Sequence, residues 1–469
     1  MVMKRIITIG GSDSSGGAGI QADIKTFSVL GVYSTSVITA VTAQNSKGVQ
    51  DILEIPVELV NSQVRSIIDD IGVDYAKTGM LSSSKMIMAV SALLKEYTVP
   101  FVLDPVMKAG SGGTLMDSAA VDALVKYLLP LCRVVTPNIM EASAISGLEI
   151  RTLSDMKEAA IAIHEKGAPA VLITGGHLEC ETGAGRATDL IYDGDGFREL
   201  TLEYIRPGPG LAPAHGKGKI LLLHGSGCSF SAALTAELAK GYDLYTAAAK
   251  AKAFVHDSIM DGDTISNFMV VNPARRMRID ADRYSVLENL KEALRLLKRT
   301  RGFKEVIPEV GTNIGMAIEG ATGIEDVAAV DGRIHPTHDG IHSGCVEFGV
   351  SSHIARMILT MMRHEPNKRS AINIKYTPEL ISACEDAGLQ VAHFEREKEP
   401  TGVETMVWGT EEALKHGGRA RGRAPDVIFD RGAYGKEAMI RIFDTTAVGV
   451  VKRLRRLLNG GTEEDEQDE

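Results

Sequence analysis

The sequence predicts an α/β protein, with a mostly parallel sheet flanked by helices, followed by a second α/β domain. Short β-rich runs that stop at Gly, Pro, Asp or Asn lie at residues 5–9, 102–105, 134–138 and 170–176. Helix-like segments lie between them, at residues 56–71, 85–97, 118–130 and 153–166. This repeated order of strand, polar loop and amphipathic helix is typical of a parallel sheet covered by helices. Ligands bind beyond the carboxyl ends of such strands, so the loops that follow them are the candidate sites.

The length and composition are those of an ordinary folded protein. The chain has 469 residues, enough for two or three domains, and 44% of them are hydrophobic and 24% charged. These values exclude a disordered chain, a collagen and a small disulfide scaffold. The net charge is −10, with a run of acidic residues at 463–469. This charge does not favour nucleic-acid binding, so we expect small-molecule substrates and no nucleic-acid partner.

The cysteines and the N-terminus indicate a cytoplasmic protein. The five cysteines are widely spaced, with no CxxC pair, at Cys132, Cys180, Cys228, Cys345 and Cys384. An odd number of separated cysteines argues for a reducing compartment and against a disulfide framework. The first apolar run is too short for a signal peptide, and no run reaches the ~18 apolar residues of a membrane helix. We expect no membrane partner, and a homodimer.

Changes in composition divide the chain into four parts. We expect a first domain at 1–262, a linker at 263–282, a second domain at 283–459 and an acidic tail at 460–469. The Gly- and Pro-rich segment 206–218 is expected to be an exposed loop of the first domain. Further helices are predicted at about 228–240, 244–259 and 281–299.

A glycine-dense turn, His224-Gly225-Ser226-Gly227-Cys228-Ser229, follows an apolar run and opens an Ala-rich helix. Backbone N–H groups and the helix dipole make such a turn a phosphate-binding site. Cys228 lies in the first helical turn, where a thiolate is favoured and the pKa of the thiol is lowered. The alternative is that small residues merely pack the start of a helix.

Three oxygen-bearing side chains follow strand-like runs nearby. Asn138 and Glu141 are three residues apart at a strand-to-helix junction and can orient waters on Mg²⁺, although they also suit a helix cap. Asp104 ends the run FVLD, where a carboxylate can polarise a nucleophile or bind metal, or can simply start a turn.

The opening loop, Gly10 to Gly19, permits close approach of the backbone to a small ligand but fits neither the dinucleotide nor the P-loop pattern. Asp23 follows on the next helix, and Gln44 ends another β-rich run. Carboxylate and amide groups suit a ligand with both donors and acceptors, such as an aminopyrimidine ring.

Residues 1–260 resemble the hydroxymethylpyrimidine and hydroxymethylpyrimidine-phosphate kinases of the ribokinase-like superfamily. The resemblance is carried by seven ordered motifs: GGSDSSGGAGIQADIKTF, TAQNSKGV, KTGML, LDPVM, TPNIMEA, GGH and HGSGCSFSAAL. It implies a ribokinase-like fold, ATP and Mg²⁺ as cofactors, and pyrimidine contacts at Gly11, Asp23 and Gln44.

The same resemblance assigns the remaining kinase residues. Cys228 stands where most relatives carry an aspartate base, and the turn Gly225, Ser226, Gly227 would stabilise the transferring phosphoryl group. Asn138 and Glu141 would organise the metal, with Glu141 acting through water and Asp104 at the same cofactor site. Thr174 stands where the family often has a lysine that contacts the nucleotide phosphates, so that contact is open.

The second domain carries features that suit a phosphate ligand. Arg333 follows the run VAAV at a strand end, where a guanidinium can bind a diphosphate bidentately. His353 opens a helix after Ser351 and Ser352, which favours an anion site, although a capping stretch with a surface histidine has the same pattern. The histidines His335, His338 and His342 suit a metal site or, since Pro336 and Gly340 lie among them, a polar loop.

Residues 300–445 resemble the archaeal-type thiamine-phosphate synthase domain, which is often fused behind a pyrimidine kinase. The matching motifs are EVGTNI, VAAVDGRI, VEFGVSSHIAR, RSAINI, FEREKEP and DRGAYGKEAMI. The resemblance implies coupling of hydroxymethylpyrimidine diphosphate with hydroxyethylthiazole phosphate. Such a step needs the charge of its leaving group neutralised, a role that fits Arg333 and His353. Asn373, Arg396 and Lys436 are further candidates for substrate binding.

The sequence therefore predicts a bifunctional thiamine-biosynthesis enzyme whose first half makes a diphosphate that its second half uses. One alternative is a vitamin-alcohol kinase acting on a pyridoxal-like substrate. The other is that the second half senses thiamine phosphates without catalysis.

Overall fold

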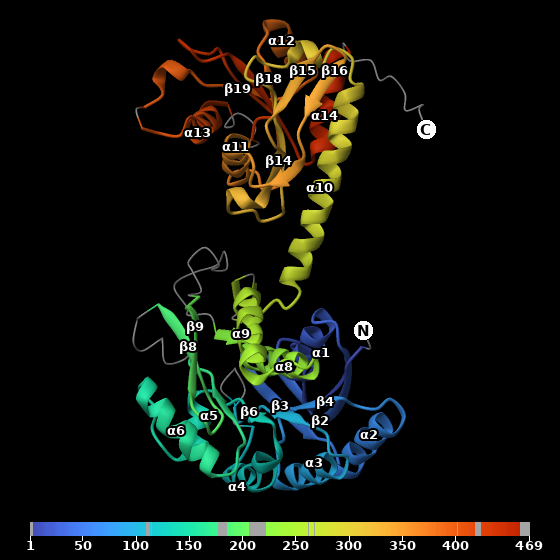
Figure 1. Cartoon of the computed structure of the whole chain (residues 1–469), viewed down its shortest axis with the longest axis vertical. Helices are drawn as coiled ribbons and strands as arrows, with labels where there is room; N and C mark the ends of the chain where they lie inside the picture. The colour runs from blue at the N-terminus through green and yellow to red at the C-terminus, as the bar shows by residue number, and fades with distance from the viewer. Residues whose placement is uncertain are drawn as a thin grey trace. The chain divides into compact units, whose positions relative to one another are not determined.

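The computed structural model describes residues 3–108, 113, 115–176, 185–205, 222–260, 262–266, 268–400, 402–417 and 424–459. The chain forms two compact units, Met1–Met277 and Arg278–Glu469 (Figure 1). The predicted loop 206–218, His177 of the GGH motif and the predicted tail 460–469 lie outside the described residues.

The segment 263–282, predicted as a linker, contains secondary structure instead. It holds β11 (Asp263–Ile265), β12 (Phe268–Val270) and the start of α10 (Arg275–Arg299). The reason is strand pairing within the first unit, because β12 lies beside both β11 and β10 (Leu222–His224).

The first unit is built on a mixed sheet with nine strands among its described residues, in the order β3-β2-β1-β4-β5-β6-β7-β8-β9. The neighbours from β2 to β7 are parallel, and β3, β8 and β9 pair antiparallel at the two edges. The predicted mostly parallel sheet is thus confirmed. Its strands are β1 (Arg5–Asp13), β2 (Tyr33–Asn45), β3 (Gly48–Glu54), β4 (Tyr75–Thr78), β5 (Phe101–Leu103), β6 (Val134–Val135), β7 (Val171–Ile173), β8 (Arg186–Tyr192) and β9 (Phe197–Glu203).

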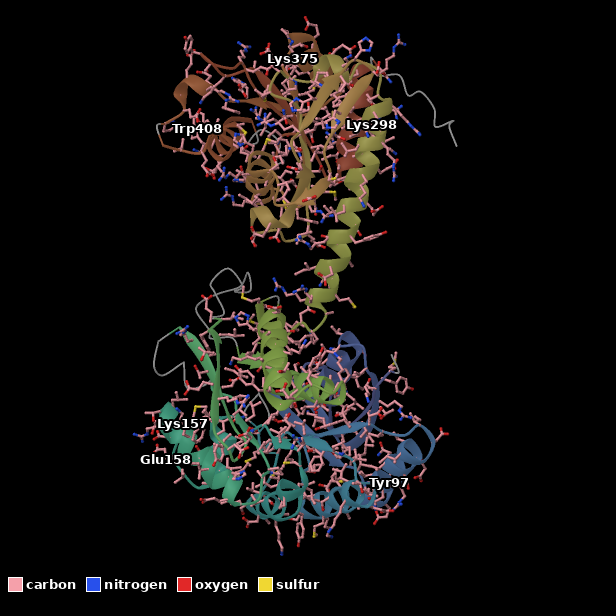
Figure 2. All side chains as sticks on the ribbon, in the orientation of Figure 1. Tyr97, Lys157, Glu158, Lys298, Lys375 and Trp408 are labelled. Atoms are coloured by element: carbon pink, nitrogen blue, oxygen red, sulfur yellow. The ribbon has the colours of Figure 1, made fainter. Side chains whose placement is uncertain are left out.

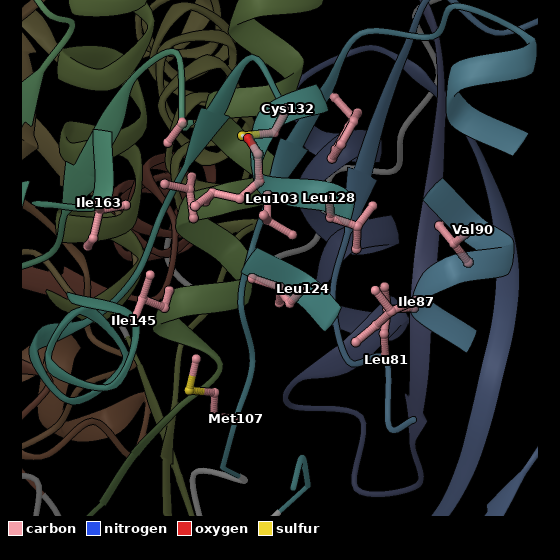
Figure 3. Close-up of a cluster of buried hydrophobic side chains, with 14 of the residues drawn as sticks. Leu81, Ile87, Val90, Leu103, Met107, Leu124, Leu128, Cys132, Ile145 and Ile163 are labelled. Carbon is pink, nitrogen blue, oxygen red and sulfur yellow. The ribbon is translucent and has the colours of Figure 1, made fainter. Parts of the chain in front are cut away.

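Helices cover both faces of this sheet, because successive strand residues point to opposite sides. Leu103 belongs to a core cluster with one helix layer (Figure 3), and Val102 to a cluster with the other. The first layer contains α2 (Val57–Asp70), α3 (Ser84–Glu96), α4 (Ser118–Ala123), α5 (Ile139–Ser146) and α6 (Leu153–Glu165). The second layer contains α1 (Gly19–Val29), α8 (Ser226–Ala239) and α9 (Leu244–Met260).

The second unit has its own sheet, with seven strands among its described residues in the order β17-β14-β13-β18-β21-β20-β19. The β19–β20 pair is parallel and the other neighbouring pairs are antiparallel. The strands are β13 (Ile314–Ala317), β14 (Val327–Val330), β17 (Val346–Phe348), β18 (Ser370–Lys375), β19 (Val391–His393), β20 (Val427–Asp430) and β21 (Met439–Asp444).

Two helix layers cover this second sheet as well. One face packs against α10, α12 (Pro378–Asp386) and α14 (Ala447–Leu458). The other packs against α11 (Ser352–Met362) and α13 (Thr405–Gly417). In this second layer, Trp408 of α13 (Figure 2) packs edge-on against Phe394, with 5.8 Å between the ring centroids.

The histidine-rich stretch of the second unit is a β-hairpin of β15 (Ile334–Thr337) and β16 (Gly340–Ser343), not the predicted loop. His335 and His342 face each other across it. In the described ranges, no group of three or more His, Cys, Asp or Glu side chains is arranged to hold a metal ion. No helix in the described part is both long and apolar enough to cross a membrane.

Candidate active sites

A cavity of about 740 Å³ lies at the carboxyl ends of the parallel strands of the first unit. The parallel strands β1, β2, β4, β5, β6 and β7 each have a lining residue at or just after their carboxyl ends, as the parallel topology predicts. The cavity brings together every residue predicted for the kinase site: Gly11, Asp23, Gln44, Asp104, Asn138, Glu141, Thr174, Gly225, Ser226, Gly227 and Cys228.

A buried ion cluster forms part of the cavity wall. The ammonium of Lys77, on β4, lies 3.0 Å from Asp23 Oδ1 and 3.2 Å from Asp104 Oδ2, and all three side chains are less than a tenth exposed. Burial acts to lower the pKa of Lys77, but Asp23 and Asp104 raise it above its ordinary value. One ammonium therefore serves two carboxyl groups. Lys77 was not among the predicted site residues, although a lysine within a buried strand is a signal the sequence does contain.

Hydrogen bonds fix both carboxyl groups of this cluster. Asp23 accepts from Thr8 Oγ1 at 2.6 Å, and Asp104 accepts from Ser231 Oγ at 2.8 Å. Burial raises the pKa of Asp23, while Lys77 acts in the opposite direction. The side chain of Asp23, which is predicted to contact a pyrimidine, is thus held in place by Thr8 and Lys77.

Cys228 lies in the first turn of α8 and lines the cavity, but its thiol is not activated as predicted. Burial, opposed by Lys77 and reinforced by Asp104 and Asp23, raises its pKa to about 12. The predicted lowering of the pKa by the helix N-terminus is therefore wrong, because desolvation of the thiolate outweighs the helix dipole. The thiol is protonated at neutral pH.

Asn138 and Glu141 form the helix cap that their spacing allowed. Asn138 Oδ1 accepts from the Glu141 backbone N–H at 3.0 Å, and Glu141 Oε2 accepts from the Asn138 N–H at 2.9 Å. Burial and, to a smaller extent, the neighbouring Asp104 together raise the pKa of Glu141 to about 8. Two carboxyl groups close together in a buried wall fit a divalent cation held partly through water, because such an ion would offset their charge.

The phosphate-binding turn is shaped by a close approach of two glycine loops. Gly225 has a φ of +86°, and a Cβ atom there would lie 1.8 Å from the carbonyl oxygen of Gly17. His224, just before it, lies 3.0 Å from Asp13 Oδ2. Burial acts to raise the pKa of Asp13, but hydrogen bonds with His224 and Ser15 lower it to about 2. The Asp13–His224 pair, which sequence reasoning missed, ties the opening loop to the turn.

The position of the missing family lysine is occupied by Thr174, whose backbone N–H donates to the Pro137 carbonyl at 3.0 Å. A cation is present in the same wall. Lys252 of α9 lines the cavity and lies 2.8 Å from Asp189, which also accepts from the Gly175 backbone N–H at 3.0 Å.

The second unit contains a buried ion cluster of opposite composition. Asp430, at the end of β20, has a fully buried side chain, and its Oδ1 accepts from Arg396 Nε at 2.7 Å. Its Oδ2 lies 2.8 Å from Nη1 of Arg441, a residue of β21 that is 2% exposed. One carboxylate therefore serves two guanidinium groups. Asp430 and Arg441 were not predicted as site residues.

His353 and Arg333 lie near this cluster. Burial lowers the pKa of His353, and the charges of Arg333, Arg356, Arg396 and Arg441 lower it further. The imidazole is therefore mostly neutral at neutral pH. Arg333 has a φ of +68° in the turn before β15, and its Nη1 donates to the Val310 carbonyl at 2.6 Å.

Two further predicted binding residues have partners within the protein. Asn373 Oδ1 accepts from the Asn313 N–H at 2.8 Å and Nδ2 donates to the Gly311 carbonyl at 3.2 Å, so this side chain supports the loop before β13. Lys436 pairs with Glu399 at 2.9 Å.

Solved structures and fold together give the class of the first unit. The pyridoxal kinase of Staphylococcus aureus, solved with pyridoxal, is 35% identical over 60% of this chain and 96% of its own, with a TM-score of 0.52. It has also been solved with ADP and with AMP-PCP. The first unit is therefore a ribokinase-like kinase domain.

Sequence comparisons extend to both units. A phosphomethylpyrimidine kinase family matches residues 13–272, and the thiamine-phosphate synthase ThiN family matches residues 289–456. The bifunctional thiamine biosynthesis protein ThiDN of Methanocaldococcus jannaschii is 32% identical over 461 residues, which are 96% of this chain and 97% of that protein. The hydroxymethylpyrimidine/phosphomethylpyrimidine kinase of Rhizobium meliloti is 44% identical over 55% of this chain and 91% of its own. The chain belongs to the family of bifunctional thiamine biosynthesis proteins that join these two domains.

Proposed function

We propose that the first unit uses ATP to phosphorylate hydroxymethylpyrimidine and then its monophosphate. The second unit couples the resulting diphosphate with hydroxyethylthiazole phosphate to give thiamine phosphate and pyrophosphate. The full-length match to a bifunctional relative carries this assignment. It favours a pyrimidine kinase over a pyridoxal-like kinase and a catalytic second unit over a sensor.

In the kinase step, the hydroxymethyl oxygen of the substrate forms a bond to the γ-phosphorus of ATP while the bond to the β-phosphate oxygen breaks. The backbone N–H groups of Gly225, Ser226 and Gly227 bind the transferring group at the start of α8. The hydroxyl proton passes to the sulfur of Cys228 in its thiolate form. Because the thiol is protonated at neutral pH, its thiolate is a minor form, and the charge of Lys77 reduces the cost of forming it.

The proposed substrate and cofactor contacts are supported by the fact that these residues line one cavity. Gly11, Asp23 and Gln44 contact the pyrimidine, and Thr174 lies at the nucleotide end. Mg²⁺ would be held at Asp104, Asn138 and Glu141, with Glu141 acting through water, and it would neutralise phosphate charge there.

In the coupling step, the bond between the pyrimidine methylene carbon and the diphosphate oxygen breaks, and the thiazole nitrogen bonds to that carbon. The leaving pyrophosphate takes the electron pair, so cationic groups near it lower the barrier. Arg333 donates charge-assisted hydrogen bonds, and His353 donates from a neutral ring or gains a proton as the anion binds. Arg396, Lys436 and Asn373 complete the substrate site.

The test is a single incubation with hydroxymethylpyrimidine, ATP, Mg²⁺ and hydroxyethylthiazole phosphate, followed by detection of thiamine phosphate. Omission of ATP should abolish the product, and supplying hydroxymethylpyrimidine diphosphate should restore it without ATP. If the complete mixture phosphorylates hydroxymethylpyrimidine but forms no thiamine phosphate, the synthase assignment is refuted.

A further inference from the structure

The cluster around Asp430 holds more positive charge than a structural ion pair requires. Both of its carboxylate oxygens are occupied by Arg396, through Nε at 2.7 Å and Nη2 at 3.3 Å. Arg441 is added to this complete pair, and its Nη1 and Nη2 are buried without a well-formed hydrogen bond within the described part of the chain. Burying a second guanidinium costs free energy that this pairing does not return.

The strand register shows how unusual this placement is. Arg441 is opposite Ile428 on β20 and opposite Asn373 on β18, so these side chains share one face of the sheet. The rest of that face is an apolar cluster that includes Phe443 and Ile354 of α11. The guanidinium of Arg441 lies 5.4 Å above the ring of Phe394. A hydrophobic residue would suit this position better if packing were its purpose.

Charges near the cluster do not cancel the excess. Arg356 is paired with Glu404 at 2.8 Å, and Lys436 with Glu399 at 2.9 Å. Among the described acidic side chains, no ion pair with Arg333 is seen, and its Nη1 contacts a backbone carbonyl. A positive excess therefore remains beside His353 at the N-terminus of α11, where backbone N–H groups add to it.

We propose that Asp430 and Arg441 are positioning residues for a phosphoryl-anion site at the coupling centre of the second unit. Asp430 aligns the fork of Arg396, and Arg441 supplies the buried positive charge that a bound diphosphate or pyrophosphate neutralises. The inference rests on the proposed coupling reaction and names two residues that act through Arg396 and His353 without needing to touch the substrate. It accounts for a buried charge that packing alone does not explain.

The test uses Arg441→Met in the full chain, because this change leaves Asp430 and Arg396 as a balanced pair beside an apolar side chain. We expect pyrophosphate binding, measured by calorimetry, to weaken about tenfold, while thermal stability stays equal or rises. The KM for the diphosphate substrate should rise more than kcat falls. Kinase activity of the same molecule should not change.

Arg453→Met is the matched control in the same unit. Arg453 lies 3.2 Å from Asp426 and 2.9 Å from Asp444, so here one guanidinium serves two carboxylates. This variant should lower thermal stability and leave the pyrophosphate Kd unchanged. Arg441→Lys, which keeps the charge but loses the fork, should fall between wild type and Arg441→Met in pyrophosphate affinity and decides the matter if Arg441→Met does not fold.

The outcomes separate this inference from the proposed function. An unchanged pyrophosphate Kd in both Arg441 variants, or no pyrophosphate binding by the wild type, overturns the inference even if thiamine phosphate is formed. If the wild type binds pyrophosphate and Arg441→Met does not, but no thiamine phosphate appears, the anion site stands and the coupling reaction fails.

Discussion

The buried ion clusters of the two units have opposite compositions. In the kinase cavity, Lys77 is shared by Asp23 and Asp104. In the second unit, Asp430 is shared by Arg396 and Arg441. Both clusters are buried beside a sheet that helices cover on both faces, where an unbalanced charge is costly.

The difference in charge between the two clusters indicates which kind of ligand each site would bind. Spare carboxyl groups suit ligands that bring donors or positive charge, such as the amino group of a pyrimidine or a divalent cation. A spare guanidinium suits a phosphoryl anion. The charge imbalance in each unit therefore matches the reaction proposed for it, in which the first unit would bind a neutral pyrimidine and a metal-bound nucleotide and the second would release pyrophosphate.

The largest expected effect separates the two activities. Cys228→Ala should reduce kinase turnover by about 10²- to 10⁴-fold, because the hydroxyl proton loses its acceptor. Coupling from supplied hydroxymethylpyrimidine diphosphate should be unchanged. Cys345→Ala, at an exposed cysteine in the second unit, is the control for thiol loss. Undiminished phosphorylation by Cys228→Ala would remove the base assignment.

The next prediction concerns the sign of the charge imbalance in each buried ion cluster, negative in the first unit and positive in the second. Lys77→Met leaves two buried carboxyl groups without a cation and should destabilise the first unit by about 3–5 kcal/mol, the range for breaking a buried pair. Arg441→Met removes a charge that is already in excess and should not destabilise the second unit. Thermal unfolding of both variants compares the two directly, and equal losses of stability would contradict this view of the clusters.

Arg333→Ala should weaken the coupling step alone, by about 10- to 100-fold, since one charge-assisted contact to the leaving group is lost. The assay is thiamine phosphate formation from supplied diphosphate, with phosphorylation of hydroxymethylpyrimidine as the internal control. Normal coupling by this variant would refute the role of leaving-group charge in the second unit.

The sequence predicted the first sheet well because its signals are local. Apolar strands that end in Gly, Pro, Asp or Asn alternate with amphipathic helices, and the helices predicted at 56–71, 85–97 and 153–166 are α2, α3 and α6. The segment 263–282 was misjudged because its strands gain their stability from pairing with a distant strand, β10. The local sequence of a segment does not reveal a partner strand that lies about 45 residues away in the chain.

For the sites, residues that follow strands were predictable and residues that act from within the core were not. The order of the motifs correctly predicted that Cys228, Asp104 and Glu141 belong to one site, and all three line the same cavity. The pKa of Cys228, however, depends on its burial, which the local sequence does not reveal. Lys77 and Arg441 lie inside strands. From the sequence alone, neither can be told from an isolated polar residue, because the carboxylates that pair with it lie on other segments of the chain.

The smallest expected effect concerns the pH dependence set by Glu141. Its pKa of about 8 in the folded protein exceeds the ordinary value of 4.5, so the folded state retains a proton that the unfolded chain has lost. Its contribution to stability is therefore lost as pH rises from about 4.5 to 8. Glu141→Gln removes this dependence and keeps the helix cap, because glutamine also serves at that position of a capping box.

In the presence of a metal chelator, Glu141→Gln and the wild type should have similar Tm values at pH 5. At pH 8 the Tm of the variant should be higher by about a few degrees. Added Mg²⁺ should reduce that gap by stabilising the wild type, and the variant should need a several-fold higher Mg²⁺ concentration for kinase activity. Glu141→Ala, which loses both cap and charge, is the control for capping. If Glu141→Gln needs the same Mg²⁺ concentration as the wild type, Asp104 and Glu141 stabilise the fold of the first unit and do not bind its metal. The comparison between the two ion clusters would then rest only on the shared ions, Lys77 in the first unit and Asp430 in the second.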